Sequence, residues 1–261
     1  MSRRLSSLVI LFGLAAAGLP AAAQDQTRLS ELPDGQNYRV CVEMAQEDPE
    51  AGFEAAITWR DEGGGPPALH CVALALYGLG QVDEAAARLE ELASGMPDAS
   101  NPERAAIFSQ AGNAWLGLGR FDRANAAFIR ALELDPSNAE YWIDRGVVRA
   151  EMGQLWEAVD DFSEALTRAP GHIDALLFRA TAYRLLDAAE LARDDVDRVL
   201  DMAPTQPSAL LELGTLHAQA GEFDDARAVW LQVIEASPES PAADVARAGI
   251  ERIDVNTGKQ Q

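Results

Sequence analysis

The sequence predicts an all-α fold in which antiparallel helix pairs repeat along the chain and stack into an open solenoid. Three sets of residues recur at intervals of 34 residues. They are the prolines Pro136, Pro170, Pro204 and Pro238, the turn residues Gly119, Gly153, Asp187 and Gly221, and the apolar residues Phe128, Phe162, Val196 and Trp230. A fixed period of this length is typical of solenoids, because one helix pair cannot bury its apolar face alone and must stack on its neighbours.

Each position in the period has a role that fits a helix, a turn and a second helix. A glycine such as Gly153 can adopt the left-handed backbone conformation that ends the first helix. A proline such as Pro170 stops the second helix, because it lacks an amide hydrogen and disfavours helical angles in the residue before it. Gly146 in the first helix indicates a close approach of the two helices, and we expect the small Ala158 to face it.

These residues and their spacing resemble the tetratricopeptide repeat family. The resemblance implies a right-handed superhelix of antiparallel helix pairs, in which the first helix of each pair lines a concave groove. The repeats are expected at 66–99, 105–138, 139–172, 173–206 and 207–240.

The segments on either side of the repeats have weaker patterns. Residues 37–65 are interpreted as a degenerate repeat or an amino-terminal cap. Residues 241–254 have apolar side chains at helical spacing up to Ile253, which predicts a carboxyl-terminal capping helix over the last repeat. The final residues, 255–261, are expected to be a disordered tail.

The amino terminus has the charged, apolar and small-residue zones of a secretory signal peptide. Its apolar run, 8–17, is shorter than the about 20 residues that a membrane-spanning helix needs. We therefore interpret 1–23 as a signal peptide that is cleaved after Ala23, and 24–36 as a flexible linker. The chain is expected in a bacterial periplasm, with full secretion as the alternative, and without membrane insertion after cleavage.

The composition is strongly acidic, with 42 acidic and 21 basic residues and a formal net charge of −21. Such a charge repels nucleic acid and favours cationic partners. The simpler interpretation is a solvated acidic surface on a helical protein, and the composition does not decide between the two.

Two arginines occupy a repeat position, the seventh, where the family usually has an apolar residue. Arg145 and Arg179 are each followed fifteen residues later by an aspartate, whereas the other three repeats combine an apolar residue with alanine. Because the two positions change together, an ion pair is expected inside each of these hairpins. The predicted pairs are Arg145 with Asp160 and Arg179 with Asp194.

The two cysteines, Cys41 and Cys71, are expected on the first helices of adjacent units. A disulfide between them fits an oxidising compartment. The alternative is two free, buried thiols.

No motif in the sequence predicts an enzyme. None of the three histidines, His70, His172 and His217, has a second ligand three or four residues away, so the pattern does not predict a zinc site. A phosphate-binding loop and a nucleophile elbow are also missing from the sequence. The expectation is a non-enzymatic protein with no catalytic residues, no cofactor and no metal.

The resemblance implies that the groove binds a protein or peptide partner. Carried onto this sequence, the family's ligand-contacting positions are Tyr77, Asn113, Leu116, Ile143, Val147, Leu177, Thr181, Arg184, Leu211 and Thr215. The apolar centre suits apolar anchors of an extended or helical peptide. The alternative is that these apolar residues only pack neighbouring repeats.

The sequence therefore predicts a protein–protein interaction scaffold of the cell envelope. The alternative function is a periplasmic chaperone or carrier that holds basic or unfolded chains through its acidic surface. The sequence does not determine the partner or the oligomeric state.

Overall fold

The computed structural model describes residues 35–258. The predicted signal peptide, the predicted linker up to residue 34, and residues 259–261 of the predicted tail lie outside this range. The described part contains thirteen α-helices and no strand. The helices are α1 (Gln36–Glu47), α2 (Pro49–Asp61), α3 (Gly65–Gly78), α4 (Val82–Ser94), α5 (Asn101–Gly117), α6 (Phe121–Leu134), α7 (Ala139–Glu151), α8 (Leu155–Arg168), α9 (Ile173–Leu185), α10 (Ala189–Met202), α11 (Pro207–Ala220), α12 (Phe223–Ala236) and α13 (Pro241–Thr257).

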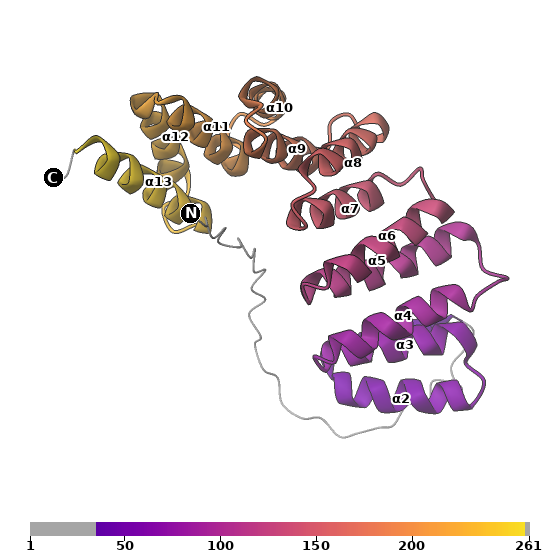
Figure 1. Cartoon of the computed structure of the whole chain (residues 1–261). Coiled ribbons are helices and arrows are strands. Elements are labelled where there is room, and N and C mark those ends of the chain that lie inside the picture. The colour runs from indigo at the N-terminus through magenta and orange to yellow at the C-terminus, as the bar shows by residue number, and fades with distance from the viewer. Residues whose placement is uncertain (1–34, 259–261) are drawn as a thin grey trace, which may run out of the picture.

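The helices form antiparallel pairs that stack into a curved, open array (Figure 1). Each helix packs mainly on the helices before and after it in the chain. The prediction of an all-α solenoid of helix pairs is confirmed. No helix of the described residues combines the length and the apolar composition needed to cross a bilayer.

The ends of the array differ from the expected bounds in small ways. The segment 37–65 holds a helix pair, α1 and α2, and α1 begins inside the predicted linker, at Gln36. The last helix, α13, continues to Thr257, beyond the expected end at residue 254. It ends there because Gly258 has the left-handed conformation, with φ of 69°, that caps a helix.

The turn residues and the close helix approach follow the sequence pattern, with one correction. Gly153 has a φ of 76°, and Asp187 has a φ of 60° at the equivalent place. A Cβ atom on Gly146 would lie only 2.5 Å from Cε1 of Phe162. The glycine therefore makes room for this aromatic ring of the second helix, which faces it more closely than the expected alanine.

The two predicted ion pairs form with a different aspartate from the one expected. Arg145 donates from Nε and one terminal nitrogen to Asp161, at 2.9 and 2.6 Å. Arg179 binds Asp195 in the same way, at 2.8 and 2.7 Å. The predicted partners, Asp160 and Asp194, are exposed to solvent, whereas Asp161 and Asp195 are buried.

The physical reason is helix geometry. Neighbouring residues on an α-helix point about 100° apart, so only one of two adjacent aspartates can face the first helix of the pair. The pattern of charged and apolar positions could not decide which of the two it is.

The charged network in the third repeat is larger than a single pair. Arg149 places a guanidinium nitrogen 2.9 Å from Oδ2 of Asp161, the oxygen that also accepts a hydrogen bond from Nε of Arg145. Two guanidinium groups lie against the ring of Trp142, with Arg145 at 4.8 Å and Arg168 at 4.7 Å from the ring centroid. One buried carboxylate thus pairs with two arginines, and an aromatic ring lies against the guanidinium group of one of them.

The predicted disulfide is confirmed, and it joins α1 to α3. The Cα atoms of Cys41 and Cys71 are 6.1 Å apart, and both residues are fully buried. The covalent bond fixes the first helix pair of the described chain against the first regular repeat.

Replacement of Asp161 by alanine is expected to lower the free energy of unfolding by about 3–5 kcal/mol, because it leaves the largely buried Arg145 without its partner. Replacement of the adjacent, exposed Asp160 should change this free energy by less than about 0.5 kcal/mol. Chemical denaturation followed by circular dichroism measures both variants. An equal loss in the two variants would contradict the pairing seen in the structure.

Replacement of both cysteines by alanine is expected to lower the free energy of unfolding by about 3–4 kcal/mol, as the chain-entropy model gives for a loop of this length. A reductant added during urea unfolding should lower the midpoint of the wild-type chain and leave that of the double variant unchanged. A wild-type midpoint that does not respond to reduction would show that the bond does not stabilise the fold.

Candidate functional site

The first helices of the repeats lie on the inner side of the curve (Figure 1). The pairs α5 and α7, α7 and α9, and α9 and α11 pack on each other across repeat boundaries. In the described part, no second helices of neighbouring repeats pack together to this extent. We use the term inner face for the surface formed by α3, α5, α7, α9 and α11.

The residues predicted to bind a partner lie on these first helices but differ in exposure. Tyr77 and Asn113 are exposed. The partly exposed ones are Leu116, Val147, Thr181, Arg184, Leu211 and Thr215. Ile143 and Leu177 are buried, with 4% and 8% of their surface accessible.

Ile143 and Leu177 belong to the hydrophobic core and offer almost no surface to a ligand. Both pack in the cluster that joins the third, fourth and fifth repeats. For these two residues the alternative interpretation, packing between neighbouring repeats, describes what the structure shows. Sequence spacing alone did not separate them from the surface positions beside them.

Arg184 forms an ion pair that crosses from one repeat to the next. Its Nε lies 2.5 Å from Oε1 of Glu212, on α11, and both side chains are largely buried. This arginine is therefore neutralised within the chain. Arg184 therefore gives the inner face no unpaired positive charge with which to bind an acidic group of a partner.

Asp144, on α7, is the partly buried acid of the inner face that forms no ion pair among the described residues. Its carboxylate accepts two long hydrogen bonds from α5, at 3.3 Å from Nδ2 of Asn113 and at 3.5 Å from Oγ of Ser109. Burial raises the pKa of Asp144 to about 6, and the nearby Glu140 adds to this rise, while the two hydrogen bonds oppose it. The structure thus holds a poorly compensated negative charge on its inner face.

The sequence analysis missed Asp144 because it considered other positions of the repeat. Asp144 occupies the sixth position, and Glu212 occupies the same position two repeats later. Gln110, at the sixth position of its own repeat, bonds His70 of the preceding repeat at 2.6 Å. A polar residue at the sixth position in three repeats was the signal that could have indicated contacts between neighbouring first helices.

Two hollows in the described part lie near the turns that join the helices of a repeat. The larger one, of about 880 Å³, is lined by residues that include Trp115, Arg120 and Arg123. The smaller one, of about 420 Å³, is lined by residues that include Glu190, His217 and Glu222. Neither contains a residue that the sequence predicted for partner binding.

Comparison with known proteins gives a consistent family. The model of the tetratricopeptide repeat family matches residues 109–173, 144–207 and 211–254. The chain is 30% identical over 127 residues to the TPR repeat-containing thioredoxin TTL4 of Arabidopsis thaliana, in a match that covers 49% of this chain and 18% of that protein. It is 27% identical over 154 residues to the DnaJ homolog subfamily C member 7 of Mus musculus, covering 55% of this chain and 31% of that protein. The matches therefore span a fifth to a third of these relatives.

Solved structures share the fold at low sequence identity. A tetratricopeptide repeat protein from Parabacteroides merdae has a TM-score of 0.68 and 21% identity, with 76% of this chain and 75% of that chain covered. YrrB, described as a TPR protein with an unusual peptide-binding site, has a TM-score of 0.57 and 17% identity, with 75% and 99% covered. Since the family model matches more than half of the residues and the helix pairs stack as it requires, the chain belongs to the tetratricopeptide repeat family.

Proposed function

We propose that this chain is a non-enzymatic scaffold that binds a partner protein or peptide on its inner face. Tetratricopeptide repeats support protein–protein interaction, and one structural neighbour is described as having a peptide-binding site. The observation that carries the proposal is Asp144, a carboxylate on the inner face that the chain itself does not neutralise. A partly buried charge without an oppositely charged partner is costly to hold, and a ligand that supplies a cationic donor lowers that cost.

The surroundings of Asp144 indicate which group of a partner it selects. The carboxylate is already in contact with two neutral donors, Asn113 and Ser109, so the arrangement accepts further hydrogen bonds. A lysine or arginine side chain of the partner would supply charge-assisted hydrogen bonds, which are about twice as strong as neutral ones. The net charge of −21 attracts such a partner over longer distances.

The proposed location is an oxidising, extracytoplasmic compartment, with the periplasm as first choice. The Cys41–Cys71 disulfide supports it, because such bonds persist in secreted and periplasmic proteins and are rare in the cytosol. The order of charged, apolar and small residues in 1–23 adds the signal that export requires.

The test of the function uses a photo-crosslinking amino acid at one of two exposed aromatic positions. Tyr77 lies on the inner face and is 54% exposed, and Trp156 lies on the second helix α8 and is 57% exposed. Crosslinked partners should form from position 77 in the native envelope and should be missing from position 156. Equal products from both positions would favour the alternative chaperone or carrier that binds over its whole acidic surface.

Replacement of Asp144 by asparagine should weaken binding of the identified partner by at least about tenfold, since a charge-assisted bond is lost. The same replacement should raise the free energy of unfolding by about 1–2 kcal/mol at neutral pH, after allowance for partial exposure to water. The sign follows from the raised pKa: the folded chain binds the proton more tightly than the unfolded chain, so stability falls as the pH rises from about 4 to about 6, and the full cost of the charged carboxylate is present at neutral pH.

The matched control is Asp160→Asn, which removes the same charge from the exposed side of α8. It should change neither binding nor stability measurably. Binding should also weaken as the pH falls from 7 to 5, because protonation removes the charge of Asp144. An Asp144→Asn variant that binds as tightly as the wild type would exclude this carboxylate from the interaction.

A further inference from the structure

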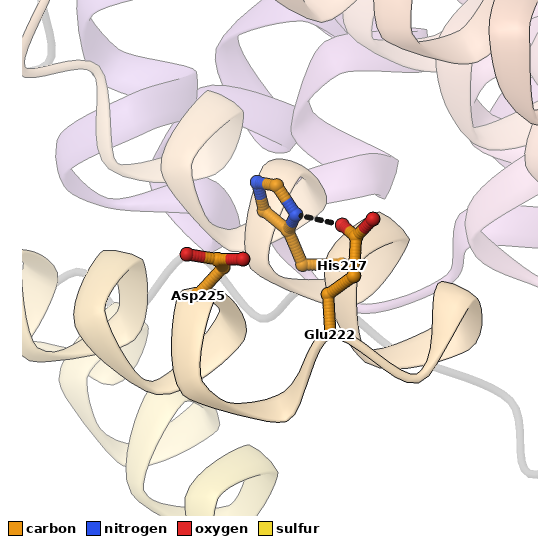
Figure 2. Close-up of side chains that lie close together, drawn as sticks. All are labelled: His217, Glu222 and Asp225. Atoms are coloured by element: carbon orange, nitrogen blue, oxygen red, sulfur yellow. Dashed lines mark hydrogen bonds and ion pairs between the residues drawn. The ribbon is translucent and has the colours of Figure 1, made fainter.

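A histidine and two carboxylates meet in the fifth repeat, where α11 turns into α12. His217 lies in the last turn of α11, Glu222 in the connecting turn, and Asp225 in the first turn of α12. One ligand atom from each residue lies within 4.8 Å of the other two. Figure 2 shows the three side chains converging, with Nδ1 of His217 at 2.6 Å from Glu222.

The turn of the chain brings these residues together. Gly221 has a φ of 82°, a left-handed conformation that ends α11 and lets α12 fold back beside it. The carboxylates therefore stand five and eight residues after the histidine. The sequence analysis searched for a second ligand three or four residues away, which is the spacing within one helix, and so did not find this group.

The fold does not require these three side chains. The equivalent positions hold Trp115, Arg120 and Arg123 in the second repeat, Arg149, Gln154 and Glu157 in the third, and Tyr183, Ala188 and Leu191 in the fourth. Those hairpins close in the same way without a histidine and with at most one carboxylate at these positions. A set of three metal-ligand types occurs at these positions only in the fifth repeat.

We propose that His217, Glu222 and Asp225 bind a zinc ion, with a remaining ligand position open to water or to a bound partner. Zinc takes imidazole and carboxylate ligands, at bond lengths of about 2.1 Å, which places two tetrahedral ligands about 3.4 Å apart. The atoms here lie within 4.8 Å of one another, and both carboxylates are exposed, so a small side-chain rotation would bring them to that spacing. An imidazole ligand disfavours calcium and magnesium, which prefer oxygen ligands.

The charges around the group favour a cation. Glu190 and Asp194, from α10, line the same hollow as His217 and Glu222. The arginine in that lining, Arg193, forms an ion pair with Asp197, at 2.8 Å. Its positive charge is therefore already used and does not offset the charges of Glu190 and Asp194. A divalent ion would offset a concentration of negative charge around this turn.

The competing explanation is that the three side chains only stabilise the helix ends through the helix dipole, with acids at the start of α12 and a histidine at the end of α11.

A zinc titration separates this explanation from the proposed zinc site. Zinc binding to the purified chain, prepared without a histidine tag, is measured by calorimetry in an excess of magnesium, which occupies unspecific acidic sites. One equivalent should bind, and His217→Ala should weaken the affinity at least about tenfold.

The matched control is His172→Ala. His172 also bonds a glutamate, with Nε2 at 2.9 Å from Oε1 of Glu140, but it belongs to no group of three ligands in the described chain. Its loss should leave the zinc affinity unchanged. Asp225→Asn, which keeps the shape of the side chain, should reproduce the loss seen with His217→Ala.

Nuclear magnetic resonance gives an independent readout, because the chain has three histidines in all. Zinc should shift the imidazole resonances of His217 and leave those of His70 and His172 in place. Zinc binding that is equally strong in the His217→Ala and wild-type chains, or no saturable binding at all, would overturn the proposal and leave the helix-end explanation.

Discussion

The structure depends on one constraint: each helix pair has apolar surface that only the next pair can cover. The largest core cluster shows this directly, since it runs without a break from Ile143 on α7 to Leu216 on α11. Phe162, Leu176 and Val196, from three different helices of that cluster, are almost fully buried. Along the third, fourth and fifth repeats the core is therefore a continuous band, and none of these three repeats has a separate core of its own.

Charged side chains also lie within this band, as an ion pair in each of two repeats. Arg145 and Arg179 each bind a buried aspartate through two nitrogen atoms, and Arg179 also donates to Ser163 of the preceding repeat, at 2.9 Å. A buried ion pair adds little stability over apolar packing, but its loss on one side is costly. These pairs fix the register of the two helices in each hairpin, while apolar contacts supply most of the stability.

The sequence allowed the fold to be predicted, but only part of the site. The period of 34 residues specifies helix, turn and helix without reference to any contact, so the fold follows from it. The disulfide could be expected because the chain has only two cysteines, on helices that were expected to be neighbours. Which of two adjacent residues faces inward depends on a rotation of about 100° per residue, and this is why Asp160 was chosen in place of Asp161. Ile143 was placed at the surface for a related reason, since a first helix faces both its own partner and the next repeat.

Contacts between repeats were harder still to predict. Asp144 accepts a hydrogen bond from Asn113 of the preceding repeat. The spacing of residues within one repeat does not indicate which side chains of neighbouring repeats are in contact. Asp144 also differs from the other charged groups of the array. Where Asp161 and Asp195 have arginine partners inside the chain, Asp144 has only neutral donors, and the proposed function follows from that difference.

The most direct test of this account measures distances between spin labels on equivalent turn residues. Gln81, Arg120, Gln154 and Ala188 occupy the same position in four successive repeats, at the outer edge of the described array. With one label fixed at 81, the distance should increase at each step as the second label moves to 120, 154 and 188, because the repeats stack in an open array. A distance to 188 that is shorter than the distance to 154 would show a closed bundle, and would contradict both the stacking and the inner face built on it.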